Sequence, residues 1–266
     1  MRSDQLKPQA INPNQLALFE REGGSVRNRI FITLLLFALT ASALTVKAQT
    51  NEVNEAIERG NGLFHRGQYN LAIFEYRGAL QWPGEHQARA RFNIGACNYR
   101  LGQLREAIRE YRAAIKLRNG QYPSASYALG VALQDLRQYA QAREAFAQAV
   151  KASGGKHAEA LFELALESQR AGDERAAFDH YQQAITQSKD RIPACHNNLG
   201  VILAKSGMLD EAMREFEIAL KQSRGKFVEA RENLALCQRA LDSSSARLIA
   251  ALKTVEGNAG AAMKAE

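Results

Sequence analysis

The chain has 266 residues, enough for one or two ordinary domains, and 46% of them are hydrophobic while only five are proline. This composition excludes a disordered low-complexity chain, and long apolar-periodic stretches without glycine or proline favour helix over strand. The formal net charge of +7 is spread along the chain, and Cys97, Cys195 and Cys237 form no CxxC pair. A concentrated basic block, a disulfide scaffold and a zinc site are therefore not indicated, and the cysteines are expected to be small packing residues.

The first predicted element is an export signal. Arg27 and Arg29 precede an uncharged apolar run from Ile30 to Val46. A basic flank, an apolar core and small-residue sites at Ala43 and Ala48 match the layout of a secretory signal peptide. The same run is just long enough to span a bilayer, so cleavage, retention as an anchor and a buried helix are the three alternatives.

This signal sets the predicted order of the N-terminal part. Residues 1–29 form a leader that stays in the cytoplasm with its positive charges, and residues 30–48 are the signal peptide or signal-anchor helix. Everything after residue 48 is then exported. The predicted location is the periplasm or cell envelope, with anchorage in the cytoplasmic membrane through Ile30–Val46 if the signal is retained.

A period of 35 residues governs residues 51–224. Small residues, a second series seven places later and an aromatic series all keep this spacing. The small residues are Gly60, Gly95, Gly130, Ala165 and Gly200; the second series is Gly67, Gly102, Arg137, Gly172 and Gly207; the aromatic series is Tyr76, Tyr111, Phe146, Tyr181 and Phe216. Such a repeat predicts stacked units, each of which buries its apolar face only against its neighbours.

Each unit is predicted to contain two helices, separated by the residue of the second series. In the last unit, Leu199 and Leu203 share one face of the first helix, and Ala212 and Phe216 share one face of the second. Glycine inside a helix costs up to about 1 kcal/mol relative to alanine. The recurrence of Gly200 and its equivalents therefore predicts close helix packing that outweighs this cost.

The pattern resembles the tetratricopeptide repeat (TPR). The resemblance rests on the small residue, the glycine seven places on, and an alanine, an aromatic residue and an alanine beyond it. The family's proline at the end of the second helix is missing in most units; instead, Pro123 and Pro193 fall in the predicted first turn of a first helix. The resemblance implies an all-α, right-handed superhelical solenoid of five helix-turn-helix repeats over 51–224, then a capping helix over 225–242 and a flexible tail over 243–266.

The resemblance also implies that a partner polypeptide binds a concave surface formed by the first helices. Aromatic residues recur there three places before the small residue, either as an apolar strip for the partner or as packing within their own repeats. Arginines of the second repeat form either a site for acidic groups or a solvated helix face. The predicted contacts are Ile57, Phe92, Tyr127, Phe162 and Asn197, with Arg89 and Arg100.

Catalysis, cofactors and metals are not indicated. The histidines form no HxxxH pair, and neither a GxSxG motif nor a phosphate loop occurs. We therefore predict a non-enzymatic, exported scaffold or adaptor that binds another protein or a peptide segment, and no nucleic acid. The alternative is an RNA-binding protein of the pentatricopeptide type, which also repeats every 35 residues. Its units lack the glycine series and the alanine series of this chain, which consists of Ala72, Ala107, Ala142, Ala177 and Ala212.

Overall fold

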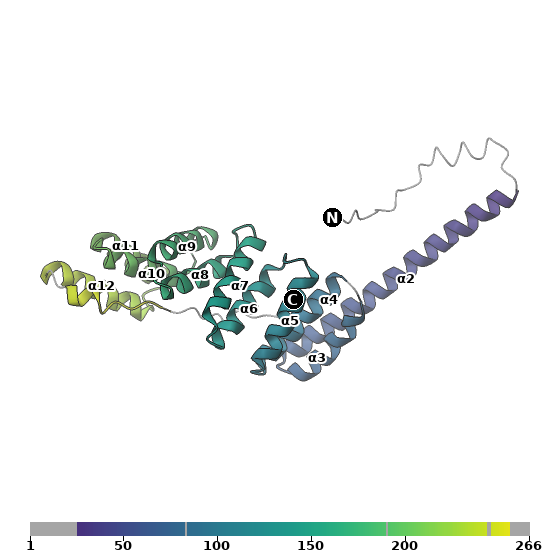
Figure 1. Cartoon of the computed structure of the whole chain (residues 1–266), viewed down its shortest axis with the longest axis horizontal. Coiled ribbons are helices and arrows are strands. Elements are labelled where there is room, and N and C mark those ends of the chain that lie inside the picture. Colours follow the sequence, from purple (N-terminus) through teal and green to yellow (C-terminus); the bar gives the residue numbers. More distant parts are fainter. Residues whose placement is uncertain (1–25, 83, 190, 244–245, 256–266) are drawn as a thin grey trace. The chain divides into compact units, whose positions relative to one another are not determined.

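The structure, a computed structural model, describes residues 26–82, 84–189, 191–243 and 246–255. Every regular element within these ranges is a helix (Figure 1). The chain divides into two compact units, residues 1–52 and residues 53–266.

The first unit is described from Val26 onward, as the N-terminal part of helix α2 (Val26–His65). The apolar core of the predicted signal lies in this helix, whereas most of the predicted leader 1–29 lies outside the described residues. Phe31 and Phe37 are 68% and 73% exposed. Within the part of the chain that was described, no helix is both long enough and apolar enough to cross a membrane. The export signal stays a prediction.

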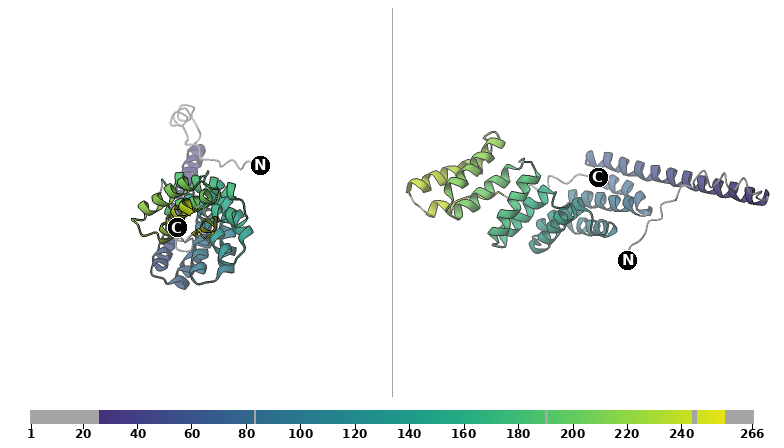
Figure 2. Two further views of the ribbon diagram at one scale, coloured as in Figure 1. Left: turned by 90° about the vertical axis from the view of Figure 1, so that its left-hand side faces the viewer. Right: turned by 90° about the horizontal axis from the view of Figure 1, so that it is seen from above.

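The second unit consists of helix pairs that contact one another in chain order, as the views of Figure 2 also show. The first pair is formed by α2 from Val53 onward and α3 (Tyr69–Gly78), followed by the short 3-10 helix η1 (Ala79–Gln81). The next four pairs are α4 (Glu85–Arg100) with α5 (Leu104–Leu117), α6 (Pro123–Asp135) with α7 (Tyr139–Ala152), α8 (Ala158–Arg170) with α9 (Glu174–Gln187), and α10 (Pro193–Lys205) with α11 (Leu209–Gln222).

The array ends with α12 (Val228–Ser243), which packs on α11 and also contacts α10. It lies where the capping helix was predicted. The short helix α13 (Ala246–Ile249) follows and contacts α12. Residues 252–255 then continue without helical structure.

In four of the repeats the small residue is a glycine that faces the aromatic ring of the second helix. A Cβ atom added to Gly130 would lie 2.5 Å from a ring carbon of Phe146, closer than real Cβ contacts come. The same contact is found in three other pairs: Gly60 with Tyr76, Gly95 with Tyr111, and Gly200 with Phe216. The two helices of a pair therefore approach so closely that the ring occupies the space that a side chain on the glycine would need. This contact explains why both the glycines and the aromatic residues recur every 35 residues.

The second series of the repeat marks the turn between the two helices. Gly67, Gly102, Gly172 and Gly207 all have φ between 74° and 83°, a region that favours glycine. Arg137 occupies the equivalent place in the third repeat and adopts the same left-handed conformation, with φ of 58°. The turn geometry is thus kept even where the glycine is lost. The prediction that Pro123 and Pro193 lie in the first turn of a helix is also confirmed.

The cysteines are free and buried, in agreement with the predicted packing role. Burial raises the pKa of Cys97 to about 12 and that of Cys237 to about 11. These thiols are therefore protonated near pH 8, and the thiolate is the reactive form. We therefore expect the native protein to resist the thiol reagent DTNB and to react at all three cysteines once guanidinium chloride unfolds it. Rapid modification of the native protein would contradict this assignment.

Candidate partner-binding site

The predicted aromatic row lies inside the repeats. Phe92, Tyr127 and Phe162 are only 4%, 8% and 6% exposed, and Ile57 is fully buried. Each of the three rings packs against the aromatic ring of the second helix in its own repeat, with ring centroids 5.8 Å apart. Of the two roles expected for these rings, the structure shows packing within the repeat.

The two predicted arginine contacts lie on the helix α4. Arg100 is exposed and Arg89 is half-buried. In the same repeat, Arg91 Nη1 lies 2.9 Å from Glu110 Oε2. Both side chains of this ion pair are half-buried. Arg89 and Arg100 remain predicted contacts for acidic groups of a partner.

The residue Asn197 belongs to a buried cluster of three asparagines, which we call the asparagine site: Asn197 and Asn198 of α10, and Asn233 of α12. All three are 0% exposed. Asn233 Nδ2 donates to Asn197 Oδ1 at 2.9 Å, and Asn197 Nδ2 donates to Asn198 Oδ1 at 3.0 Å. The hydroxyl of Tyr181 accepts a hydrogen bond from Asn198 Nδ2 at 3.1 Å. The side chains are therefore held in fixed orientations by one another and by the neighbouring repeat.

The asparagine site binds the backbone of residues 252–255, which we call the tail segment. Lys253 N donates to Asn233 Oδ1, and Asn233 Nδ2 donates to Lys253 O, both at 2.8 Å. Val255 N donates to Asn198 Oδ1, and Asn198 Nδ2 donates to Val255 O, again at 2.8 Å. A fifth hydrogen bond runs from Asn197 Nδ2 to Lys253 O at 3.1 Å.

This geometry recognises an extended backbone rather than a particular sequence. A carboxamide has one acceptor and donor hydrogens on the same planar group, so it can bond both the N–H and the C=O of one residue. Lys253 and Val255 are two residues apart, and alternate residues present their polar backbone groups to the same side only when the chain is extended. The asparagines therefore act as the edge of a strand would, and any residue except proline could occupy the two bonded positions.

The spacing of the asparagines follows the repeat. Asn198 and Asn233 are 35 residues apart and occupy the same place in successive first helices, two before the small residue. Asn93 has this place in the second repeat, where its Nδ2 donates to Asn61 Oδ1 at 3.2 Å. The other repeats have Glu58, Ala128 and Glu163 there, which cannot make the paired contact. The 35-residue spacing of Asn198 and Asn233 is thus a sequence signal for this site, although the predicted contacts included only Asn197.

Side chains beside the site contact those of the tail segment. Lys253 Nζ lies 2.6 Å from Glu232 Oε2, and this carboxylate raises the pKa of the lysine. Leu252 packs against the apolar core formed by the last helix pairs and α12. Leu252 and Val255 are half-buried, whereas Lys253 and Thr254 are exposed. The prediction of a flexible tail from residue 243 did not include this contact, and residues 256–266 lie outside the described part.

The chain was then compared with known proteins. Family models described as tetratricopeptide repeat match residues 88–121 and residues 127–192, which together cover the second, third and fourth helix pairs. These helix pairs are tetratricopeptide repeats. A comparison with curated proteins found no significant match.

Solved TPR-like structures share the fold. The crystal structure of MamA aligns with a TM-score of 0.55 at 22% identity, covering 63% of this chain and 95% of that one. PilF of Pseudomonas aeruginosa gives a TM-score of 0.62 at 15% identity, with coverage of 77% and 90%. YrrB, described as a TPR protein with an unusual peptide-binding site, gives 0.51 at 21% identity, with coverage of 60% and 79%. At these identities the likeness establishes the fold: an all-α solenoid of TPR hairpins.

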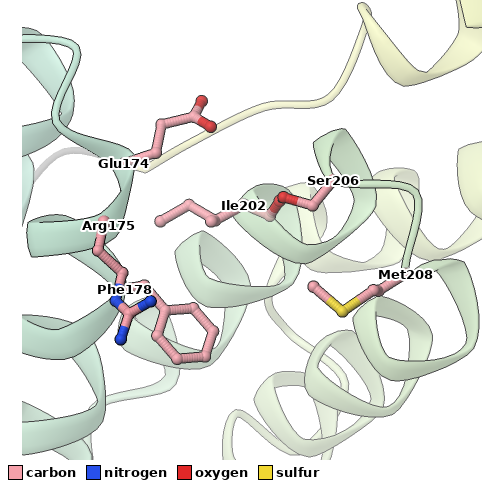
Figure 3. Close-up of a pocket in the computed structure, with 6 residues that line it drawn as sticks. All are labelled: Glu174, Arg175, Phe178, Ile202, Ser206 and Met208. Carbon is pink, nitrogen blue, oxygen red and sulfur yellow. The ribbon is translucent and has the colours of Figure 1, made fainter.

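A hollow of the TPR array lies between its last two repeats. Its volume is about 430 Å³, and its lining residues are Glu174, Arg175, Phe178, Ile202, Ser206 and Met208. Figure 3 shows Phe178, Ile202 and Met208 around an apolar centre, with the charged Glu174 and Arg175 at one side. In the hollow, Ser206 Oγ donates to the backbone oxygen of Ile202 at 3.1 Å, and the described ranges contain no group of three metal-binding side chains. It adds an apolar recess next to α10, the helix that contributes two members of the asparagine site.

Proposed function

We propose that this chain is an exported scaffold that binds an extended segment of a partner polypeptide along the first helices of its TPR array. The observation that carries the proposal is the paired hydrogen bonding of Asn198 and Asn233 to the backbone of a non-helical segment. Two carboxamides at equivalent places in successive first helices, covered by the segment that they bind, form a receptor for an extended backbone.

The rest of the array supports this function by holding the receptor rigid. Recognition is most selective when the binding side chains are already ordered before the ligand arrives. Here α10 is packed against α9, α11 and α12, and the hydroxyl of Tyr181 fixes the carboxamide of Asn198. The peptide-binding site named for YrrB supports peptide binding as a property that this fold can carry. Arg89 and Arg100 of the second repeat are proposed to contact acidic groups farther along the partner.

Export is the second part of the proposal. The basic flank and apolar run of residues 27–46 support passage through the cytoplasmic membrane, followed either by cleavage near Ala48 or by retention as an anchor. The partner is accordingly proposed to be a protein of the cell envelope. Fractionation and N-terminal sequencing of the mature protein test this part. A full-length product confined to the cytosol would contradict it.

Binding is tested with the double variant Asn198→Ala and Asn233→Ala in an affinity capture from the envelope fraction. We expect wild-type protein to retain a defined partner that the double variant loses, because both paired backbone contacts are removed. Asn70→Ala, at an exposed position of α3, is the matched control and should retain the partner. Far-UV circular dichroism must show that all three proteins are folded. Equal retention by wild type and the folded double variant would show that the asparagines do not bind the partner.

A further inference from the structure

The tail segment differs from the helices of the array in how it is held. Leu252 N donates to Ile249 O of α13 at 3.3 Å, whereas the backbone groups of Lys253 and Val255 are bonded to side-chain carboxamides of α10 and α12. Lys253 and Thr254 remain exposed, and only Leu252 and Val255 are partly covered. The array is already closed by α12, which packs on α11. The tail segment therefore lies on a completed solenoid in the way that a bound peptide would.

The tail segment helps to satisfy the polar atoms of the asparagine site. With the tail segment in place Asn198 and Asn233 are 0% exposed, and a covered amide without a hydrogen-bond partner is unfavourable. The acceptor Asn233 Oδ1 takes its hydrogen bond from Lys253 N. If the tail segment leaves, this oxygen must bond to water or to the backbone of another polypeptide. The site is thus built for a backbone ligand, and the chain supplies one itself.

We propose, on the basis of the function given above, that residues Leu252–Val255 are an internal competitor that occupies the asparagine site until a partner segment of the same chemistry displaces them. The contact is weak enough for exchange. Each hydrogen bond adds little net stability, because the released groups bond to water instead, and ordering four residues opposes the contact. Its strength comes mainly from the covalent tether, which gives the tail segment a high effective concentration at the site.

The contacts of the tail segment also define the chemistry of the partner. The carboxylate of Glu232 receives the ammonium group of Lys253, and the charge of Glu229 adds to the attraction. Leu252 packs on the apolar core, Val255 is half-buried and Thr254 is exposed. The matching partner segment is extended, with an apolar residue, a basic residue, any residue and a second apolar residue in succession. It runs opposite to the order of the repeats, because Lys253 meets α12 and Val255 meets α10.

The competition is tested with a fluorescent peptide that has the sequence of residues 250–257, AALKTVEG. In the double variant Lys253→Pro and Val255→Pro of the full chain, the two N–H donors of the tail segment are removed. We expect this variant to bind the peptide about tenfold or more tightly than wild type, because the tethered competitor is lost. The N–H of Thr254 takes no part in the described contacts, so Thr254→Pro is the matched control and should bind as wild type does.

The outcomes separate the two proposals. Equal, measurable binding of the peptide by wild type and the double proline variant would overturn the internal competitor while leaving the site intact. No binding by the double proline variant would overturn both the competitor and the asparagine site as a peptide receptor. Asn233→Ala in the proline background should abolish the gained affinity. A gain that depends on protein concentration would show that the tail segment binds a second copy, which would overturn an intramolecular competitor.

Discussion

Replacing Gly130 by leucine is expected to lower the free energy of unfolding by about 3 kcal/mol or more, the upper part of the range for overpacked cores. Gly130 lies in the central repeat, and an added Cβ atom would already be 2.5 Å from the ring of Phe146. The rest of a leucine side chain has no space there, so α6 and α7 must separate. Because each repeat is stabilised by its neighbours, this separation should also weaken the contacts with α5 and α8. Denaturant unfolding followed by far-UV circular dichroism measures the loss.

The matched control is the substitution Gly62→Ala in α2. A Cβ atom at Gly62 would meet only the side chain of Arg66, at 3.6 Å. Alanine should therefore raise stability by about 0.5–1 kcal/mol through its higher helix propensity. The alanine variant of Gly130 should fall between the two, since the fourth repeat naturally has Ala165 at the equivalent place. If Gly130→Leu is as stable as wild type, the ring of Phe146 does not occupy the space beside Gly130.

The repeat architecture could be predicted because its determinants recur. The glycines recur every 35 residues, and so do the aromatic residues. Both series arise from one kind of contact, such as that of Gly130 with Phe146, which is formed again in other repeats. The turns could also be predicted, since glycine at a fixed place indicates a left-handed conformation. Arg137 has a φ of 58°, which an arginine by itself does not indicate. Its place in the series of turn glycines does indicate this conformation. The period therefore predicts the turn conformation even in a repeat where the glycine is replaced.

The candidate site could be predicted only in part, because its decisive contacts do not recur. Asn197 was named for its place in the aromatic row, whereas its observed role depends on Asn233 in the next repeat and on Lys253 beyond it. The tail segment meets α10 across more than 50 residues of chain, and no periodic pattern reports such a contact. The reversal of the chain after α12 is a tertiary feature. A search for asparagine at 35-residue spacing would have found Asn198 and Asn233, but not their ligand.

Replacing Phe162 by serine is expected to lower the free energy of unfolding by about 3–5 kcal/mol. The repeat pattern allows two roles for this ring, and contact with a partner alone would make the substitution harmless to the fold. In the structure the side chain is 6% exposed and packs on Tyr181, which in turn bonds to Asn198. Serine removes the ring, leaves a cavity and adds a hydroxyl to an apolar core. Loss of partner binding by this variant would therefore accompany loss of structure, as thermal and denaturant unfolding should show.

The same chemical change at an exposed position separates the two roles. Phe74 of α3 is 74% exposed, so Phe74→Ser should change stability by no more than about 0.5 kcal/mol. If Phe162→Ser instead unfolds like wild type but no longer binds the partner, the ring contacts the partner. The aromatic row would then be part of the binding site together with the asparagine site. If stability falls as expected, the aromatic rings hold the first helices in position, and the proposed selectivity for a partner rests on the asparagines that those helices carry. The position of the Asn198 carboxamide then depends on a chain of contacts that begins at Phe162 and passes through Tyr181.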